Sequence, residues 1–146
     1  MIPGLSDAEF FRYGAVHRNT FINAPALLTS TLELRSEAGL YFAGQIAGTE
    51  GYVESAALGG LAARFVAARL CGKEPSLPPE TTAHGGLLTH LSRPNADYQP
   101  SNITFAHLPP LAGVSRKLDK RTRYEAVAER ALADLDAFIA RADAAA

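Results

Sequence analysis

The chain has 146 residues, of which 47% are hydrophobic and 20% are charged, and its formal net charge at pH 7 is -1. Such values are typical of a single globular domain and exclude a collagen, a coiled coil and a disordered tail. The near-neutral balance also excludes an overall basic field, so any contact with nucleic acid has to come from a local patch.

Cysteine usage and the N-terminal residues indicate a reducing compartment. Cys71 is the only cysteine, which excludes an internal disulfide, and no spacing of cysteine and histidine is that of a zinc site. The first ten residues, MIPGLSDAEF, lack the basic start and the apolar run of a signal peptide. Since no apolar stretch approaches the ~18 residues of a membrane span, we expect a soluble cytoplasmic protein without membrane contact.

The first half of the chain is predicted to contain extended segments followed by one long helix. Aromatic and β-branched residues recur at every second or third place over RYGAVHRNTFINAP, which favours an extended segment or strand. A short alternating strand is predicted over residues 31–34 and a buried strand over residues 40–44. Apolar and small residues then recur at helical spacing over residues 52–70, and Gly72 is placed for a left-handed helix cap.

The second half is predicted to form a short helix, an irregular loop and a long terminal helix. The short helix, over residues 81–91, follows the Pro-rich connection EPSLPPE and is interrupted by Gly85 and Gly86. Residues 92–114 hold four prolines and few periodic positions, so we expect an ordered irregular loop there. The terminal helix is predicted from about residue 115 to residue 142, with an apolar face formed by Tyr124, Val127, Ala131, Leu135, Phe138 and Ile139.

A glycine-rich turn lies between the predicted buried strand and the long helix. Gly44, Gly48 and Gly51 would let the backbone approach a ligand closely, and the free N–H groups of the first helical turn favour an electron-rich or anionic group. A tight connection that binds nothing explains the same glycines, and spacing alone leaves both interpretations open. The GxGxxG pattern of dinucleotide-binding turns does not occur in the chain.

Three separated motifs carry a resemblance to a known family. They are RYGAVHRNTFIN, FAGQIAGTEGYVESAA and YQPSNITFAHLPPL, in this order. Together they resemble the C-terminal part of the folate-dependent tRNA uracil-5 methyltransferases, the TrmFO family, over nearly the whole chain. The sibling flavoprotein of tRNA wobble-uridine carboxymethylaminomethyl modification shares the FAGQ-type segment but not HRNTFIN. This sibling remains an alternative, as does a non-enzymatic remnant or RNA-binding module.

The resemblance implies an α/β fold. The chain would be the C-terminal part of a Rossmann-like FAD/NAD(P)-binding flavoprotein, with residues 1–114 on the FAD and folate side and residues 115–146 as a C-terminal helix. The N-terminal part of the family, with its GxGxxG turn and its nucleophilic cysteine, has no counterpart here. We therefore expect a fragment that is inactive alone, whose partner is the missing N-terminal half, and which has no catalytic residue of its own. Cys71 lies outside every motif and is expected to be a buried small hydrophobe.

The activity implied by the resemblance is that of an FADH2-oxidizing methylenetetrahydrofolate–tRNA (uracil-5) methyltransferase. FAD is reduced by NAD(P)H, takes a one-carbon unit from methylenetetrahydrofolate and delivers it to C5 of a T-loop uridine in tRNA. The motif places His17 against the folate pterin, with Arg18 and Asn19 as donors to a folate or phosphate oxygen. The flavin-side residues, by the same match, are Gly44, Gln45, Gly48, Glu50, Gly51, Tyr52 and Ser55.

A basic cluster begins the terminal helix and could contact tRNA phosphates. A solvated helix face is the other interpretation of such a cluster. Its candidate RNA-binding residues are Arg116, Lys117, Lys120, Arg121 and Arg123, which together with Arg130 outnumber the local acidic residues and leave a charge of +3.

No metal site is expected. His84 and His90 are six residues apart, whereas neighbours on a helix face are three or four apart, and Asp97 does not complete a set. His107 is expected to be a surface or hydrogen-bonded residue. Glu54 is expected to be an ordinary acidic residue at a helix start.

Overall fold

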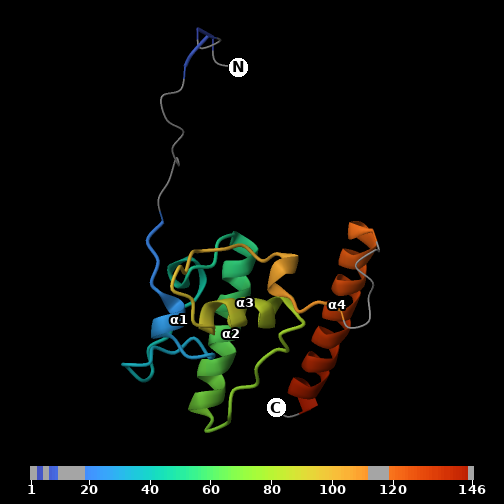
Figure 1. Ribbon diagram of the computed structural model, residues 1–146. Coiled ribbons are helices and arrows are strands. Elements are labelled where there is room, and N and C mark those ends of the chain that lie inside the picture. The colour runs from blue at the N-terminus through green and yellow to red at the C-terminus, as the bar shows by residue number, and fades with distance from the viewer. Residues whose placement is uncertain (1–2, 5–6, 10–18, 112–118, 145–146) are drawn as a thin grey trace.

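The computed structural model describes residues 3–4, 7–9, 19–111 and 119–144. Figure 1 shows α2 and α3 crossing in the middle of the molecule, with α4 along one side. In chain order the elements are α1 (Ala24–Leu27), η1 (Gly44–Ala47), α2 (Tyr52–Leu70), α3 (Ala83–Ser92), η2 (Phe105–His107) and α4 (Lys120–Ala144).

Extended pairing among the described residues is limited to isolated bridges. Leu28 pairs with Leu34, and Glu33 pairs with Tyr41, both antiparallel. The strands predicted over residues 31–34 and 40–44 are therefore wrong. The chain turns instead, because the Thr29 hydroxyl accepts the N–H of Glu33 at 3.2 Å, and Gly44 already begins η1.

The predicted buried strand fails for a second reason. Leu40 is 43% exposed, and residues 41–43 are only half-buried, so this apolar run lies along the edge of the core. The described residues thus do not confirm the Rossmann-like α/β fold, while the terminal helix is confirmed. Most of the first predicted extended segment and the boundary at residues 114 and 115 lie outside the described residues.

Helix α2 confirms the prediction for residues 52–70 at both ends. Its C-terminus closes with a Schellman motif, in which the N–H of Lys73 donates to Ala68 O at 2.8 Å and the N–H of Gly72 donates to Arg69 O at 3.0 Å. Gly72 has φ +67°, the left-handed conformation predicted for it. The expected burial of Cys71 is wrong, because this turn leaves the end of α2, and Cys71 with it, exposed.

Helix α3 begins one turn beyond the Pro-rich connection, as the sequence indicates. Thr82 is its N-cap and is fully buried, and its hydroxyl accepts the N–H of Gly85 at 3.0 Å and donates to Pro79 O at 2.7 Å. The residues before and after α3 are irregular, apart from the single turn η2, which agrees with the loop predicted over residues 92–114 for the part that is described.

Helix α4 begins at Lys120, after Asp119, whose carboxylate accepts the N–H of Thr122 at 3.1 Å. That hydrogen bond lowers the pKa of Asp119 from its ordinary value. The predicted start at residue 115 lies outside the described residues. The predicted apolar face is correct at Phe138, which is buried, but Ile139 is 47% exposed, because α4 packs along the edge of the core rather than into it.

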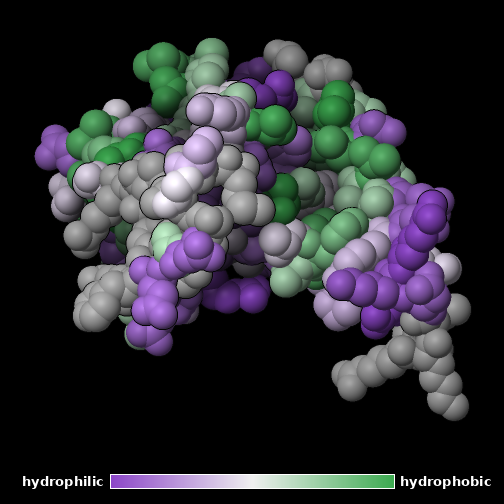
Figure 2. Space-filling model, turned by 90° about the horizontal axis from the view of Figure 1, so that it is seen from above, coloured by the Kyte–Doolittle hydropathy of each residue, from purple (hydrophilic) through white to green (hydrophobic). Residues whose placement is uncertain are grey.

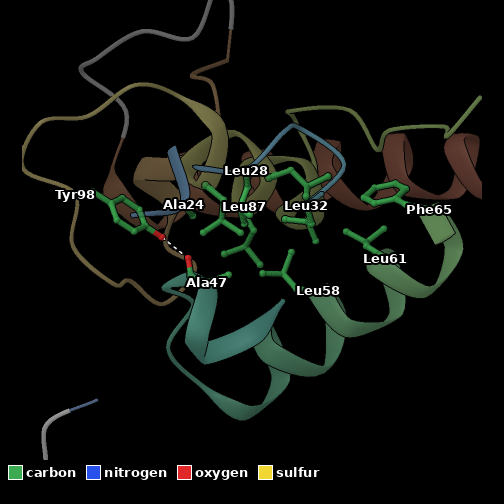
Figure 3. Close-up of a cluster of buried hydrophobic side chains, with 11 residues drawn as sticks. Ala24, Leu28, Leu32, Ala47, Leu58, Leu61, Phe65, Leu87 and Tyr98 are labelled. Atoms are coloured by element: carbon green, nitrogen blue, oxygen red, sulfur yellow. Dashed lines mark hydrogen bonds between the residues drawn. The ribbon is translucent and has the colours of Figure 1, made fainter. Parts of the chain in front are cut away.

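The core is formed where α2, α3 and the segment around α1 meet, as Figure 3 shows. Leu58, Leu61 and Phe65 come from α2, and Leu87 comes from α3. Tyr98 closes one end: its hydroxyl donates to Ala47 O at 2.6 Å, and burial raises its pKa to about 12. The core thereby holds η1, which forms the first part of the glycine-rich turn.

The described ranges contain no helix with the length and apolar character needed to cross a membrane. In the same ranges, no three side chains of the metal-ligating types come together.

Candidate functional site

A cavity of about 370 Å³ lies at the start of α2. It gathers residues that the resemblance assigns to two different ligands, since Asn19 belongs to the folate side and the others to the flavin side. The lining residues are Asn19, Gln45, Gly51, Tyr52 and Ser55.

Two glycines shape the backbone beneath this cavity. Gly48 ends η1 with φ +91°, and a Cβ there would lie 2.1 Å from the Tyr98 hydroxyl oxygen. Gly44 has φ +71°, and its Cβ would lie 3.2 Å from Ser55 Cβ. Both glycines are buried and neither lines the cavity, so they position its walls.

Gly51 is the N-cap of α2 and has φ +92°. No side chain caps this helix, so the N–H groups of its first turn are available to an acceptor at the cavity. A Cβ at Gly51 would lie 2.2 Å from Glu54 Oε2 and 2.7 Å from Asn102 Nδ2. Glu54 also accepts the N–H of Ile103 at 3.3 Å, so this carboxylate links the helix start to the third motif.

The remaining flavin-side candidates differ in their surroundings. Tyr52 is 98% exposed, whereas Ser55 is half-buried and its hydroxyl donates to Thr49 O at 3.4 Å. Glu50 does not line the cavity, and its N–H donates to Ser101 O at 3.0 Å. Its main-chain contact gives Glu50 a role in holding the turn.

The three motifs that carry the resemblance meet at this turn. The N–H of Ile22, in the first motif, donates to Ile46 O at 2.9 Å. Ser101, in the third motif, forms a parallel bridge with Thr49, and its N–H donates to Gly48 O at 3.1 Å. Main-chain hydrogen bonds thus join the turn to one segment about 25 residues before it and to another about 50 residues after it.

Sequence reasoning missed Tyr98 and Asn102 as parts of this site. Tyr98 carries the hydrogen bond to Ala47 O, and Asn102 packs against Gly51. Both lie in the motif YQPSNITF, which was their only indication, because nothing in a lone tyrosine or asparagine shows that it will be folded against a turn 50 residues away. Two folate-side candidates, His17 and Arg18, lie outside the described residues.

The basic cluster is divided by the structure. Arg116 and Lys117 lie outside the described residues. Arg121 pairs with Glu125 at 2.8 Å, and Arg130 donates to Pro109 O at 2.6 Å, so part of the predicted charge is used within the molecule. Lys120 and Arg123 are the cations of the first turns of α4 that remain, with the Nε of Arg123 buried and unpartnered.

His90 and His107 form a separate pair, with ring centroids 4.9 Å apart. Burial, and then the charge of His107, lower the pKa of His90. The Nδ1 of His107 accepts the N–H of Thr104 at 3.1 Å, which confirms a hydrogen-bonded histidine at this position.

Comparison with known proteins gives one family and several relatives. The model of the glucose inhibited division protein A family (GIDA) matches residues 1–74. The chain is 50% identical over 141 residues to a protein of Geobacter sulfurreducens, covering 96% of this chain and 32% of that relative. It is 53% identical over 136 residues to a protein of Myxococcus xanthus, covering 90% of this chain and 30% of the relative.

Both relatives carry the name methylenetetrahydrofolate–tRNA-(uracil-5-)-methyltransferase TrmFO, which confirms the resemblance seen in the three motifs. The chain spans about a third of their length. Since the family model matches just over half of the residues, the chain belongs to the glucose inhibited division protein A family.

Proposed function

We propose that this chain is part of a flavin-dependent tRNA methyltransferase, in which a methylene from methylenetetrahydrofolate is transferred to C5 of a T-loop uridine with FADH2 as reductant. The observation that carries the proposal is the meeting of the three motifs at the glycine-rich turn, beside the cavity that residues of the first two motifs line. Relatives about 50% identical over nearly the whole chain bear the name of this activity. A cytoplasmic location, and NAD(P)H as the source of electrons, belong to the same proposal.

The residues at the cavity fit one edge of a flavin. The uncapped N–H groups at the start of α2 suit the electron-rich pyrimidine edge of the ring. Gly51 lines the cavity and lets Glu54 and Asn102 approach the helix start, where a side chain would meet both of them. Gln45 and Ser55 add polar groups at the lining. When bound, FAD supplies the electrons that reduce the transferred carbon.

In the proposed enzyme, the residues of this chain bind and orient the flavin and the folate. Asn19 shares the cavity with Gln45, so a folate held by Asn19 would lie beside the flavin edge. His17 and Arg18, the neighbours of Asn19 in sequence, are proposed for the same ligand. The GxGxxG turn and the nucleophile would come from the rest of the longer protein.

The activity is tested in the longer protein with a tRNA transcript that lacks the T-loop methyl group. We expect Asn19→Ala and Gln45→Ala each to lower kcat/KM about 3- to 10-fold, the effect of losing one neutral hydrogen bond. Gln99→Ala, at an exposed glutamine that does not line the cavity, is the matched control. Methyl transfer that requires glycine and a GTPase in place of folate would contradict the proposal in favour of the wobble-uridine enzyme.

The missing part of the longer protein is proposed to cover one face of α2. This α2 face consists of exposed apolar and small residues at helical spacing, with Val53 80% and Leu70 82% exposed at its ends. Figure 2, which looks onto the end of the molecule where α2 begins, shows hydrophobic side chains reaching the surface. A helix so apolar on its outer side needs a partner surface. The members between these ends are Ala56, Gly59, Gly60, Ala63 and Ala67.

A charge on the α2 face tests this contact. This chain and the remaining two thirds of the longer protein are produced as separate polypeptides and mixed, and the complex is measured by size-exclusion chromatography. We expect Ala63→Glu to abolish the complex, because the new carboxylate would be buried without a partner. Ala133→Glu, on the exposed side of α4, is the control and should leave the complex intact. Without its partner, the unchanged chain is expected to self-associate, and a monodisperse monomer would contradict the assignment of the face.

A further inference from the structure

We propose that the stacked pair Phe105 and Tyr124 forms a platform for an unstacked nucleobase of the RNA substrate. The inference rests on the proposed function, because it names how an RNA would be held by the part of this chain that precedes and begins α4. Phosphate contacts were expected in this region from sequence; a base contact was not.

The two rings stack on each other at the surface and form a wall two rings thick. Their centroids are 4.1 Å apart and their planes differ by 8°, so each ring keeps one outer face. Phe105 is 41% exposed and Tyr124 is 37% exposed, whereas aromatic residues of the core such as Phe65 and Tyr98 are buried. Exposed aromatic rings of this kind are the usual surface on which proteins stack single-stranded bases.

A hollow lies on each side of this wall, because both rings line two separate cavities. The first, of about 470 Å³, is walled by apolar residues from Leu108 to Leu111 and by Val127 of α4, with Arg123 as its cation. The second, of about 510 Å³, is walled by Asp119 and by residues of the first three turns of α4, among them Lys120 and the ion-paired Glu125. A base stacked on Phe105 in the first hollow would have apolar contacts on its faces and a cationic group at its edge.

Charge selects RNA over an apolar protein segment as the occupant. Lys120 Nζ lies 5.4 Å from the centroid of the Tyr124 ring, and Arg123 lines the first of the two hollows. Base oxygens and phosphate oxygens are acceptors that suit these two cations, whereas an apolar segment offers them no partner.

The platform is also close to the candidate flavin cavity along the chain. Ser101, which is bonded to the glycine-rich turn, precedes Phe105 by four residues, and four residues of extended chain span at most about 14 Å. An RNA base on Phe105 would therefore be held near the cavity at which the proposed methyl transfer takes place. The same short segment would connect RNA binding with the position of the turn.

The experiment measures binding of a T-arm RNA hairpin to the longer protein by fluorescence anisotropy over a range of salt concentrations. Phe105→Ala and Tyr124→Ala are expected to weaken Kd about 5- to 150-fold, the range that corresponds to the loss of one stacked base, with the salt slope unchanged. Tyr124→Phe keeps the ring and should keep the affinity. Arg123→Gln should reduce the salt slope by about one contact. Leu132→Ala, an exposed apolar residue of α4, and Arg35→Gln are the matched controls.

A second RNA distinguishes base stacking from other uses of the pair. A set of hairpins is prepared in which one loop position at a time is abasic. At one of these positions, the abasic hairpin should bind the unchanged protein as weakly as the intact hairpin binds the Phe105→Ala variant. That abasic hairpin should bind the Phe105→Ala variant no more weakly still. Unchanged binding of the hairpin by Phe105→Ala overturns the proposal. The proposal is also overturned if Phe105→Ala and Tyr124→Ala weaken only the complex between this chain and the rest of the longer protein. Hairpin binding with no methyl transfer would contradict the proposed function while leaving the platform supported.

Discussion

Replacing Gly51 by alanine is expected to lower the free energy of unfolding by about 3 kcal/mol and to abolish flavin binding in the longer protein. The added Cβ would lie 2.2 Å from Glu54 Oε2 and 2.7 Å from Asn102 Nδ2, at a φ of +92° that side chains rarely adopt. Both atoms end flexible side chains and can shift, but a shift of the Glu54 carboxylate would weaken its 3.3 Å hydrogen bond from the N–H of Ile103, which joins the start of α2 to the third motif. Flavin content is read from the absorbance of the purified protein, and stability from urea unfolding followed by circular dichroism.

Gly39→Ala is the matched control for this variant. Gly39 has φ +89°, almost the same as Gly51, but a Cβ there meets nothing within 4 Å. The control therefore carries the backbone strain alone, about 1 to 2 kcal/mol, and should keep its flavin. If Gly51→Ala retained full flavin occupancy, the assignment of this turn to the flavin would be wrong.

Gly85→Ala is expected to be more destabilising still, by about 4 kcal/mol. Its Cβ would lie 1.9 Å from Pro79 O, a main-chain atom that cannot move aside as a flexible side chain can. Pro79 O accepts from both the N–H and the hydroxyl of Thr82, so its displacement also breaks the cap of α3. Urea unfolding of the 146-residue chain at low protein concentration measures the loss.

Gly60→Ala gives the opposite sign in the same measurement. Gly60 lies in the middle of α2, and a Cβ there meets nothing within 4 Å. Alanine should stabilise the chain by about 0.5 to 1 kcal/mol, because it restricts the unfolded chain and favours the helix. Equal effects of the two glycine substitutions would show that the packing of Gly85 against Pro79 does not determine stability.

The helices were predictable because their causes are local. The limits of α2 follow from the apolar repeat over residues 52–70 and from Gly72, and both act within a few residues. The strands predicted before α2 were wrong. An apolar run such as residues 40–44 indicates only that the segment prefers contact with other apolar groups. Whether it pairs in a sheet depends on partner strands, which the described residues do not supply.

The candidate site shows the same division. The glycines, Gln45 and Ser55 were predicted together because they share one motif, and the structure places Gln45, Gly51 and Ser55 around one cavity. The part played by Tyr98, whose hydroxyl bonds Ala47 O, depends on a contact across 51 positions. A pattern of neighbouring residues does not predict such a contact. The basic cluster was overestimated for a related reason, since the ion pair and main-chain hydrogen bonds of Arg121 and Arg130 are tertiary features.

The sequence by itself determined the family, the long helices and the turn that carries the candidate site, because motif identity and helical periodicity are properties of consecutive residues. Only the tertiary structure decided that three distant motifs meet at the turn around Ile46 and Gly48, that Gly51 and Gly85 have no room for a side chain, and that Phe105 stacks on Tyr124. Each of these depends on the distance between segments far apart in the chain. That distance is fixed by packing of the whole core and not by any local preference.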